Sequence, residues 1–189
     1  MRFDVLTDKE NEIAKHIIEI MKLLEIPPTE DNSDTPLRIA KMYSREVFRN
    51  RQFDYGELMS QMTLFPYHPL NVKGVKENPV EIKGIKFTSM CSHHWLPFTG
   101  YVDISYIPNN NLLGLSKFPR VVKYMSKRPC MQEELTNDIG EFLVNLLNPK
   151  YLSVTLRDVK HSCVEARGVE SECEVDTYYT YEKEGSHEA

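Results

Sequence analysis

The stretch VEIKGIKFTSMCSHHWLPFTGYVDISYI, residues 80–107, combines two strand-like segments with a histidine-rich corner. In residues 80–87 and again in residues 100–107, apolar and polar side chains alternate with the period of two that half-buried strands show. Between these segments stands Cys91-Ser92-His93-His94. We therefore expect two strands that flank a corner carrying one cysteine and two histidines.

The segment before these strands has helical periodicity. Thr7-Asp8-Lys9-Glu10 is a capping box, and apolar residues then recur at helical spacing until Pro27-Pro28. Thr35 is a suitable N-cap with a proline directly after it, which predicts a second helix to about Phe48. Residues 49–78 show no clear period, so we expect an irregular connection there.

The segment after the strands contains two more helical patterns and two more strands. Ser116 offers an N-cap for a helix to about Lys127, and Met131 to Leu147 has a second helical pattern. Residues 151–164 and 173–181 alternate and are rich in Val, Thr and Tyr, as strands are. Since no strand–helix–strand repetition occurs, the order predicts an α+β fold with an antiparallel sheet and helices on one side of it.

Composition is that of a globular protein. The 189 residues suffice for one domain, which we divide into N-terminal helices 1–50, an α+β core 79–182 and a polar tail 183–189. The net charge of -5 argues against a nucleic-acid partner. No apolar run reaches the ~18 residues of a membrane span, and no export signal is recognisable, so we expect a cytoplasmic protein with reduced cysteines.

Two short segments carry residue types that bind metal. Cys91-x2-His94 has the spacing with which a thiolate and an imidazole from one corner hold the same ion. His161-Ser162-Cys163 would place a second imidazole and a second thiolate on one face of a strand. The spacing alone leaves three interpretations open: a catalytic zinc site with three ligands, a closed structural site with four, or buried cysteines beside unrelated histidines.

Several motifs together resemble GTP cyclohydrolase I in order and spacing. The resemblance spans residues 34–168 and includes the second predicted helix, where Thr35 to Tyr43 is similar to the corresponding helix of that family. The motifs that carry it are Cys91 to His94, Gly114-Leu115-Ser116-Lys117, Arg120, Gln132-Glu133 and His161-x-Cys163-x3-Arg167-Gly168.

This resemblance implies an enzyme and an assembly. The implied reaction is zinc-dependent hydrolysis of the imidazole ring of GTP at C8, which releases formate and forms 7,8-dihydroneopterin triphosphate for pterin or folate biosynthesis. The implied fold is a tunnelling-fold barrel of antiparallel sheets, closed by several subunits. The implied partner is therefore a second copy of the chain, in a homodecamer with active sites between neighbouring subunits.

The resemblance also implies roles for individual residues. Cys91, His94 and Cys163 match the ligands of Zn²⁺, which leaves His93 and His161 for proton transfer. Histidine suits such transfer near neutral pH, and we favour His161 for the proton that N7 of the purine receives.

The implied substrate-binding residues form a second set. Glu133 matches the residue that pairs with the N1–H and amino group of guanine. The remaining matches are Gln132 and the residues assigned to the triphosphate, namely Arg38, Lys41, Ser116, Lys117, Arg120 and Arg167. Without the resemblance, Arg38 and Lys41 would be interpreted as a solvated helix face.

One position departs from the family's pattern. Ser92 stands where the family usually has glutamate, which removes a carboxylate next to the metal site. This departure keeps two alternatives open: a purine-nucleotide hydrolase with altered substrate, and a zinc- or nucleotide-binding protein without turnover. Four further residues near the motifs are expected to be buried core residues without a site role, namely Trp95, Phe98, Cys130 and Cys173.

Overall fold

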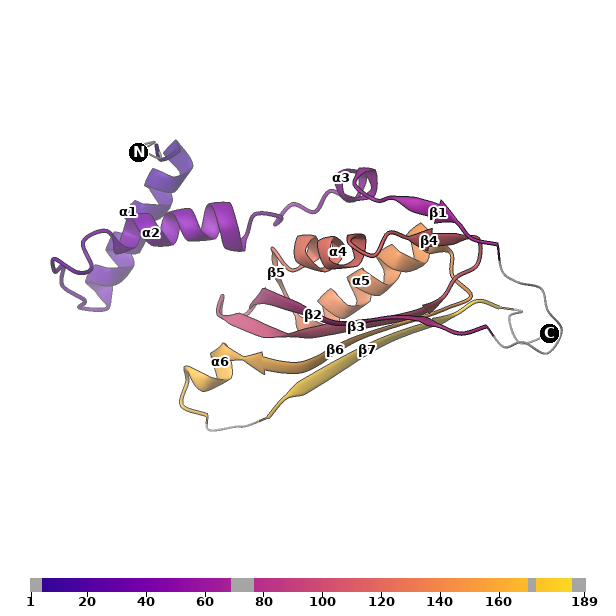
Figure 1. The fold of residues 1–189 in the computed structure, drawn as a ribbon. Helices are drawn as coiled ribbons and strands as arrows, with labels where there is room; N and C mark the ends of the chain where they lie inside the picture. Colours follow the sequence, from indigo (N-terminus) through magenta and orange to yellow (C-terminus); the bar gives the residue numbers. More distant parts are fainter. Residues whose placement is uncertain (1–4, 69–76, 170–172, 185–189) are drawn as a thin grey trace. The chain divides into compact units, whose positions relative to one another are not determined.

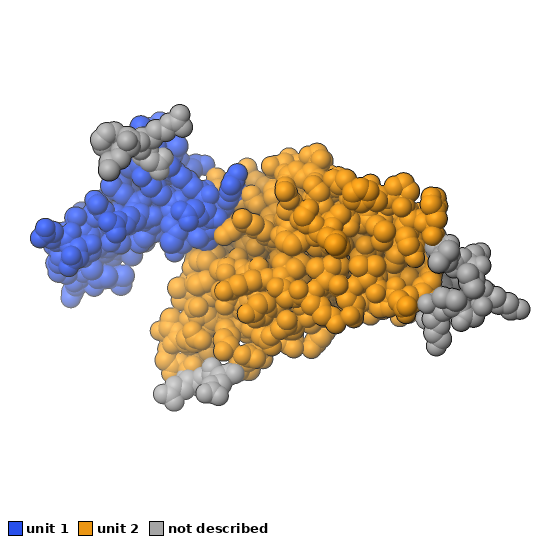
Figure 2. All heavy atoms as spheres, viewed as in Figure 1, with its two compact units in different colours: residues 1–49 blue, residues 50–189 orange. Residues whose placement is uncertain are grey.

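The computed structural model describes residues 5–68, 77–169 and 173–184. The chain divides into two compact units, residues 1–49 and residues 50–189, which Figure 2 shows in different colours. Each unit is described by itself. The prediction of a single domain over residues 1–189 stays a prediction.

The first unit consists of helices, as its periodicity predicts. Helix α1, Asp8–Leu23, begins with the expected capping box: the Thr7 N–H donates to the Glu10 carboxylate at 2.9 Å, and the Glu10 N–H donates to the Thr7 hydroxyl at 3.2 Å. Helix α2, Thr35–Lys41, continues as the π-helix η1, Met42–Val47. The expected N-cap at Thr35 is wrong by one residue, because Asp34 occupies that position and its carbonyl accepts from Arg38.

An ion pair between the half-buried Arg45 and the buried Glu10 joins the two helical segments of this unit. Arg45 donates from Nε to Glu10 Oε1 at 2.5 Å and from Nη2 to Glu10 Oε2 at 2.6 Å, while the Ser44 hydroxyl donates to Oε1 at 2.9 Å. The hydrogen bonds from Arg45 hold the pKa of the Glu10 carboxyl far below its usual range. This bidentate geometry is the strong form of a carboxylate–guanidinium contact. Arg45 therefore stabilises the packing of the helices in this unit.

The second unit is built on a five-stranded sheet in the order β5-β2-β3-β6-β7. The strands are β2 Val80–Cys91, β3 Pro97–Ile107, β5 Pro129–Cys130, β6 Tyr151–His161 and β7 Val175–Glu182. All pairs are antiparallel except β2–β5, which is parallel over two residues. The predicted α+β class with a mainly antiparallel sheet is therefore confirmed.

Two helices cover one face of this sheet. Helix α4, Lys117–Met125, and helix α5, Gln132–Leu147, lie together over the strands in Figure 1. Their apolar sides pack on alternate strand residues to form the core. Helix α5 fits closely at Gly140, where an added Cβ would lie 2.2 Å from the Tyr179 ring of β7. Glycine at this position thereby lets α5 lie close to β7.

The expectation of an irregular connection over residues 49–78 is wrong where the structure describes it. Helix α3, Tyr55–Ser60, begins at Asp54, whose carboxylate accepts from the Glu57 N–H at 3.0 Å. Strand β1, Leu64–Pro66, pairs with β4, Asn111–Leu113. Because β1 obtains its partner from a distant part of the chain, no local period marks it. Residues 69–76 lie outside the described residues.

The end of β6 also differs from the sequence prediction. The strand stops at His161, and Ser162–Glu165 form the short helix α6, in which the Ala166 N–H donates to the Ser162 carbonyl at 2.8 Å. The prediction that Cys163 shares a strand face with His161 is therefore wrong, because Cys163 follows His161 in a helical turn. Of the predicted polar tail, residues 185–189 lie outside the described residues.

No helix among the described residues is both long enough and apolar enough to cross a membrane.

Candidate functional site

The corner between β2 and β3 brings one cysteine and two histidines together. The Cys91 N–H donates to the Leu96 carbonyl at 2.9 Å, and the Trp95 N–H donates to the Cys91 carbonyl at 2.9 Å, which closes a tight turn. Trp95 takes a left-handed φ of 52°, which a bulky residue rarely adopts. As a result, Nδ1 of His93 lies 3.8 Å and Nδ1 of His94 lies 4.0 Å from Cys91 Sγ.

The three residues that match the family's ligands meet at this corner. One donor atom from each of Cys91, His94 and Cys163 lies within 4.8 Å of the other two. Tetrahedral zinc with two sulfur ligands and one nitrogen ligand requires ligand atoms roughly 3.5–3.8 Å apart. Both thiols are buried and the imidazole is exposed, so the donor set is soft and open on one side. These residues fit a zinc ion that keeps one position for water.

Electrostatics at the two thiols also favour a cation. Burial raises the pKa of the Cys163 thiol, and the neighbouring Cys91 raises it further. The Arg167 guanidinium acts in the opposite direction on the same pKa. Two buried thiolates this close repel each other, and a divalent cation between them would remove that repulsion.

His161 is held beside this group by a ring and an amide. Its imidazole stacks on Phe98 with 4.9 Å between ring centroids and 11° between planes. Its Nε2 lies 2.9 Å from Oε1 of Gln132. Burial lowers the pKa of His161, and the Glu133 carboxylate opposes that shift. The surroundings thus favour a neutral imidazole with a fixed ring plane.

Gln132 lies inside the protein at the first turn of α5 and is 3% exposed. Its Nε2 donates to the Val175 carbonyl at 2.9 Å and to the Thr177 hydroxyl at 3.1 Å. Its side chain therefore bridges His161 to β7. The predicted substrate role of Gln132 stays a prediction.

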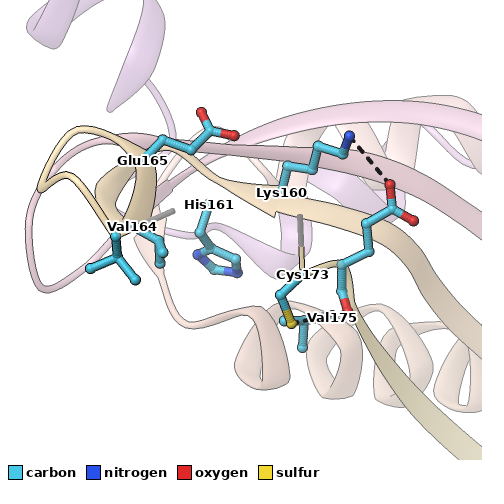
Figure 3. Close-up of a pocket in the computed structure, with 8 residues that line it drawn as sticks. Lys160, His161, Val164, Glu165, Cys173 and Val175 are labelled. Carbon is cyan, nitrogen blue, oxygen red and sulfur yellow. Dashed lines mark hydrogen bonds and ion pairs between the residues drawn. The ribbon is translucent and has the colours of Figure 1, made fainter. Parts of the chain in front are cut away.

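A cavity of ≈ 580 Å³ opens beside His161. Figure 3 shows Lys160 and His161 among the lining residues. The Lys160 ammonium lies 3.3 Å from the carboxylate of Glu174, which also lines the cavity. Cys173 also lines this cavity and is exposed, so the expectation that it is buried is wrong.

Some residues assigned to the triphosphate lie at the start of α4. Ser116 and Arg120 are exposed, and Lys117 is half-buried. The backbone N–H groups at the start of a helix favour anions, so this position suits a phosphate group. Pro119 stands in the first turn, where its missing N–H is tolerated.

The other triphosphate candidates are spread over the chain. Arg167 is exposed and follows α6. Arg38 and Lys41 belong to the unit of residues 1–49, where the Arg38 side chain is 76% exposed and lies 3.9 Å from the Asp34 carboxylate.

Several features of the site were not visible in the sequence. Trp95 is 52% exposed, so the expectation of a core residue is wrong there, whereas Phe98 and Cys130 are buried as expected. The hydroxyls of Thr136 and Thr177, which support Gln132, belong to no motif. The alternation of β7 could have predicted that Thr177 faces α5. It could not have predicted which turn of α5 lies opposite Thr177.

Comparisons with known proteins agree with the motif resemblance. The model of the family described as GTP cyclohydrolase I matches residues 13–188. GTP cyclohydrolase 1 of Blochmanniella pennsylvanica is 39% identical over 163 residues, which cover 85% of this chain and 69% of that protein. GTP cyclohydrolase 1 of Photobacterium profundum is 38% identical over 164 residues, which cover 86% and 71%.

Two further similarities are more partial. The bifunctional protein FolKE of Lactococcus lactis subsp. lactis is 40% identical over 162 residues, which cover 84% of this chain and 44% of that protein. Among solved structures, the archaeosine synthase QueF-Like in the apo form aligns with a TM-score of 0.46 at 23% identity, over 56% of this chain and 95% of that chain.

The geometry of the three donors predicts one divalent ion per chain. Titration with Co²⁺, followed by thiolate-to-cobalt absorption, should saturate at one equivalent. Cys91→Ala and Cys163→Ala should each abolish the signal, because each removes a thiolate of the group. Cys130→Ala is the matched control, since its buried thiol contacts the Ser89 hydroxyl instead. Loss of the signal in the control, or its survival in Cys91→Ala, would contradict this assignment.

Proposed function

The chain belongs to the GTP cyclohydrolase I family, and we propose that it hydrolyses the imidazole ring of GTP at C8, releasing formate and forming 7,8-dihydroneopterin triphosphate. The observation that carries this proposal is the meeting of Cys91, His94 and Cys163 within 4.8 Å at one corner of the sheet. A protein that only bound nucleotides would need neither this open donor set nor a histidine fixed beside it.

Zn²⁺ would be held by Cys91, His94 and Cys163, and when bound it supplies an activated water and Lewis acidity for hydrolysis at C8. The protein's own contribution is proton transfer. Opening of the ring requires a proton at N7, and we assign it to His161, whose plane is fixed by Phe98. His93 is the second candidate for proton transfer, since it is exposed at the same corner.

We assign recognition of the guanine to Glu133. Its carboxylate lies exposed in the first turn of α5 and close enough to His161 to affect that residue's pKa. Two acceptor oxygens match the two donors on the edge of guanine, and adenine lacks this pair. Triphosphate binding is assigned to Ser116, Lys117, Arg120 and Arg167, together with Arg38 and Lys41 from the unit of residues 1–49.

The sheet has two edges on which further copies could pair. Strand β7 is an edge strand over Val175–Glu182, and β2 pairs with β5 only at Met90 and Cys91 among the described residues. Pairing between the β7 edge of one copy and the β2 edge of the next would close a ring. We propose a tunnelling-fold barrel of this kind in a homodecamer, with the whole chain acting as one functional domain in the cytoplasm.

The proposed assembly predicts the mass in solution. Size-exclusion chromatography with light scattering should give ten times the chain mass of 22.0 kDa. A mass of one chain would contradict both the closed barrel and active sites between subunits.

The proposed reaction is tested by incubating zinc-loaded protein with GTP and measuring formate and the fluorescent oxidised pterin. His161→Ala should retain zinc and GTP but lose ~100- to 10,000-fold in turnover, the usual contribution of a positioned acid or base. Tight binding of GTP without formate would favour the binding-protein alternative. Turnover of another purine nucleotide in preference to GTP would favour the altered-substrate alternative. Loss of zinc from His161→Ala would make that residue a ligand.

Recognition of guanine predicts the effect of Glu133→Gln. The variant places a donor against a donor of the base, so the affinity for GTP should fall by ~1–3 kcal/mol, measured by calorimetry. Glu134→Gln is the matched control, because the Glu134 carboxylate accepts from the Met131 N–H at 2.9 Å and serves the helix. Equal affinities for GTP in both variants would remove Glu133 from the site.

A further inference from the structure

The orientation of the Gln132 amide follows from its partners. Two groups of β7 lie at one end of this amide, the Val175 carbonyl at 2.9 Å and the Thr177 hydroxyl at 3.1 Å. A backbone carbonyl only accepts hydrogen bonds, so the NH₂ end of the amide must face it. The carbonyl end, Oε1, is therefore the end that faces His161.

This orientation determines which nitrogen of His161 carries hydrogen. Oε1 of Gln132 only accepts, and it lies 2.9 Å from Nε2 of His161. Nε2 must therefore be the N–H. In the neutral imidazole the lone pair then lies on Nδ1.

The hydroxyls behind Gln132 support the same direction. Thr136 donates its one hydrogen to the Gln132 backbone carbonyl at 2.9 Å. The contact of 2.6 Å between Thr136 and Thr177 must then be donated by Thr177. Thr177 is left to accept from the Gln132 amide. Each donated hydrogen in this half-buried chain has one acceptor, and reversing the amide would leave the Val175 carbonyl facing an oxygen.

We propose that Gln132 is a positioning residue that fixes His161 as the Nε2–H tautomer, so that proton transfer with the substrate takes place at Nδ1. This inference rests on the proposed function, and it replaces direct substrate contact as the role of Gln132. For the donating step Nδ1 must first take up a proton, which makes His161 the imidazolium; its Nδ1–H bond then breaks, and an N–H bond forms at the purine N7, which takes over the positive charge. The electron pair of that bond stays on Nδ1. His161 is then the neutral Nε2–H tautomer, whose hydrogen bond to Oε1 of Gln132 is unchanged.

The positioning role predicts a split between kcat and KM. Gln132→Met keeps the side-chain volume and removes the acceptor, so kcat for GTP should fall, though by less than the ~100- to 10,000-fold expected when the positioned acid itself is removed. KM should change less than about threefold, because the substrate loses no contact. Gln132→Glu keeps an acceptor for Nε2–H but sets its second oxygen against the Val175 carbonyl, so its kcat should lie between those of Gln132→Met and the wild type. A rise in KM with unchanged kcat would return Gln132 to substrate binding and overturn the inference.

A second pair of variants tests the support behind the amide. Thr177→Val removes the hydroxyl that accepts from Gln132 and should lower kcat, whereas Thr177→Ser keeps it and should match the wild type. Thermal melting of all four variants separates a general loss of stability from the effect on His161. Equal kcat in Thr177→Val and Thr177→Ser would contradict the proposed chain of hydrogen bonds.

The tautomer can be measured without any turnover. In GTP-free, zinc-loaded protein labelled with ¹⁵N at histidine, long-range ¹H–¹⁵N spectra should show His161 as the Nε2–H form. In Gln132→Met a mixture of both tautomers should appear. An Nδ1–H form in the wild type would overturn the inference. Absence of formate from wild-type protein would instead overturn the proposed function, and the spectra would still decide the tautomer.

Discussion

The antiparallel pairing of β3 with its two long neighbours is the constraint on which the site depends. The pairing of β2 with β3 places Cys91, the last residue of β2, next to the start of β3, and the register of β6 places His161 opposite Phe98 at that same end. Two segments about 70 residues apart in sequence are thereby brought to one edge. Gly100 is part of this constraint, since an added Cβ would lie 2.8 Å from the Arg157 carbonyl oxygen of β6. A shift of register by one residue would turn Phe98 away from the core and His161 away from its ring.

The part of the fold that the sequence predicts correctly is the part set by local signals. The capping box at Thr7 and the alternation in residues 80–87 and 100–107 each report the structure of their own segment, and all three are found where expected. Strand β1 has no such signal because only β4 stabilises it. The predicted end of β6 at residue 164 is wrong for a similar reason. Residues 151–164 continue to alternate between apolar and polar types, although the helical turn that begins at Ser162 ends the strand at His161.

The site divides in the same way between motif and packing. Spacing and resemblance identify Cys91, His94 and Cys163 together, and the structure brings their donor atoms into one group. Neither spacing nor resemblance indicates what orients His161, since its partners are neutral side chains of ordinary type, Phe98 of β3 and Gln132 of α5, and Gln132 is in turn held by β7. Contacts of this kind depend on how α5 seats on β7, where Gly140 lets the helix approach the Tyr179 ring.

The groups assigned to chemistry range from buried to exposed. Cys91, Cys163 and Gln132 are buried and His161 is half-buried, whereas His93 and His94 are exposed at the same corner. Glu133, Arg120 and Arg167 are exposed on one chain, although buried recognition groups discriminate better than solvated ones. Exposed residues of this kind could become buried recognition groups only if another copy covered them, as in the assembly proposed above. Glu133 also lies close enough to His161 for its carboxylate to oppose the lowering of that residue's pKa, so a covering copy that desolvated Glu133 would strengthen this effect on His161.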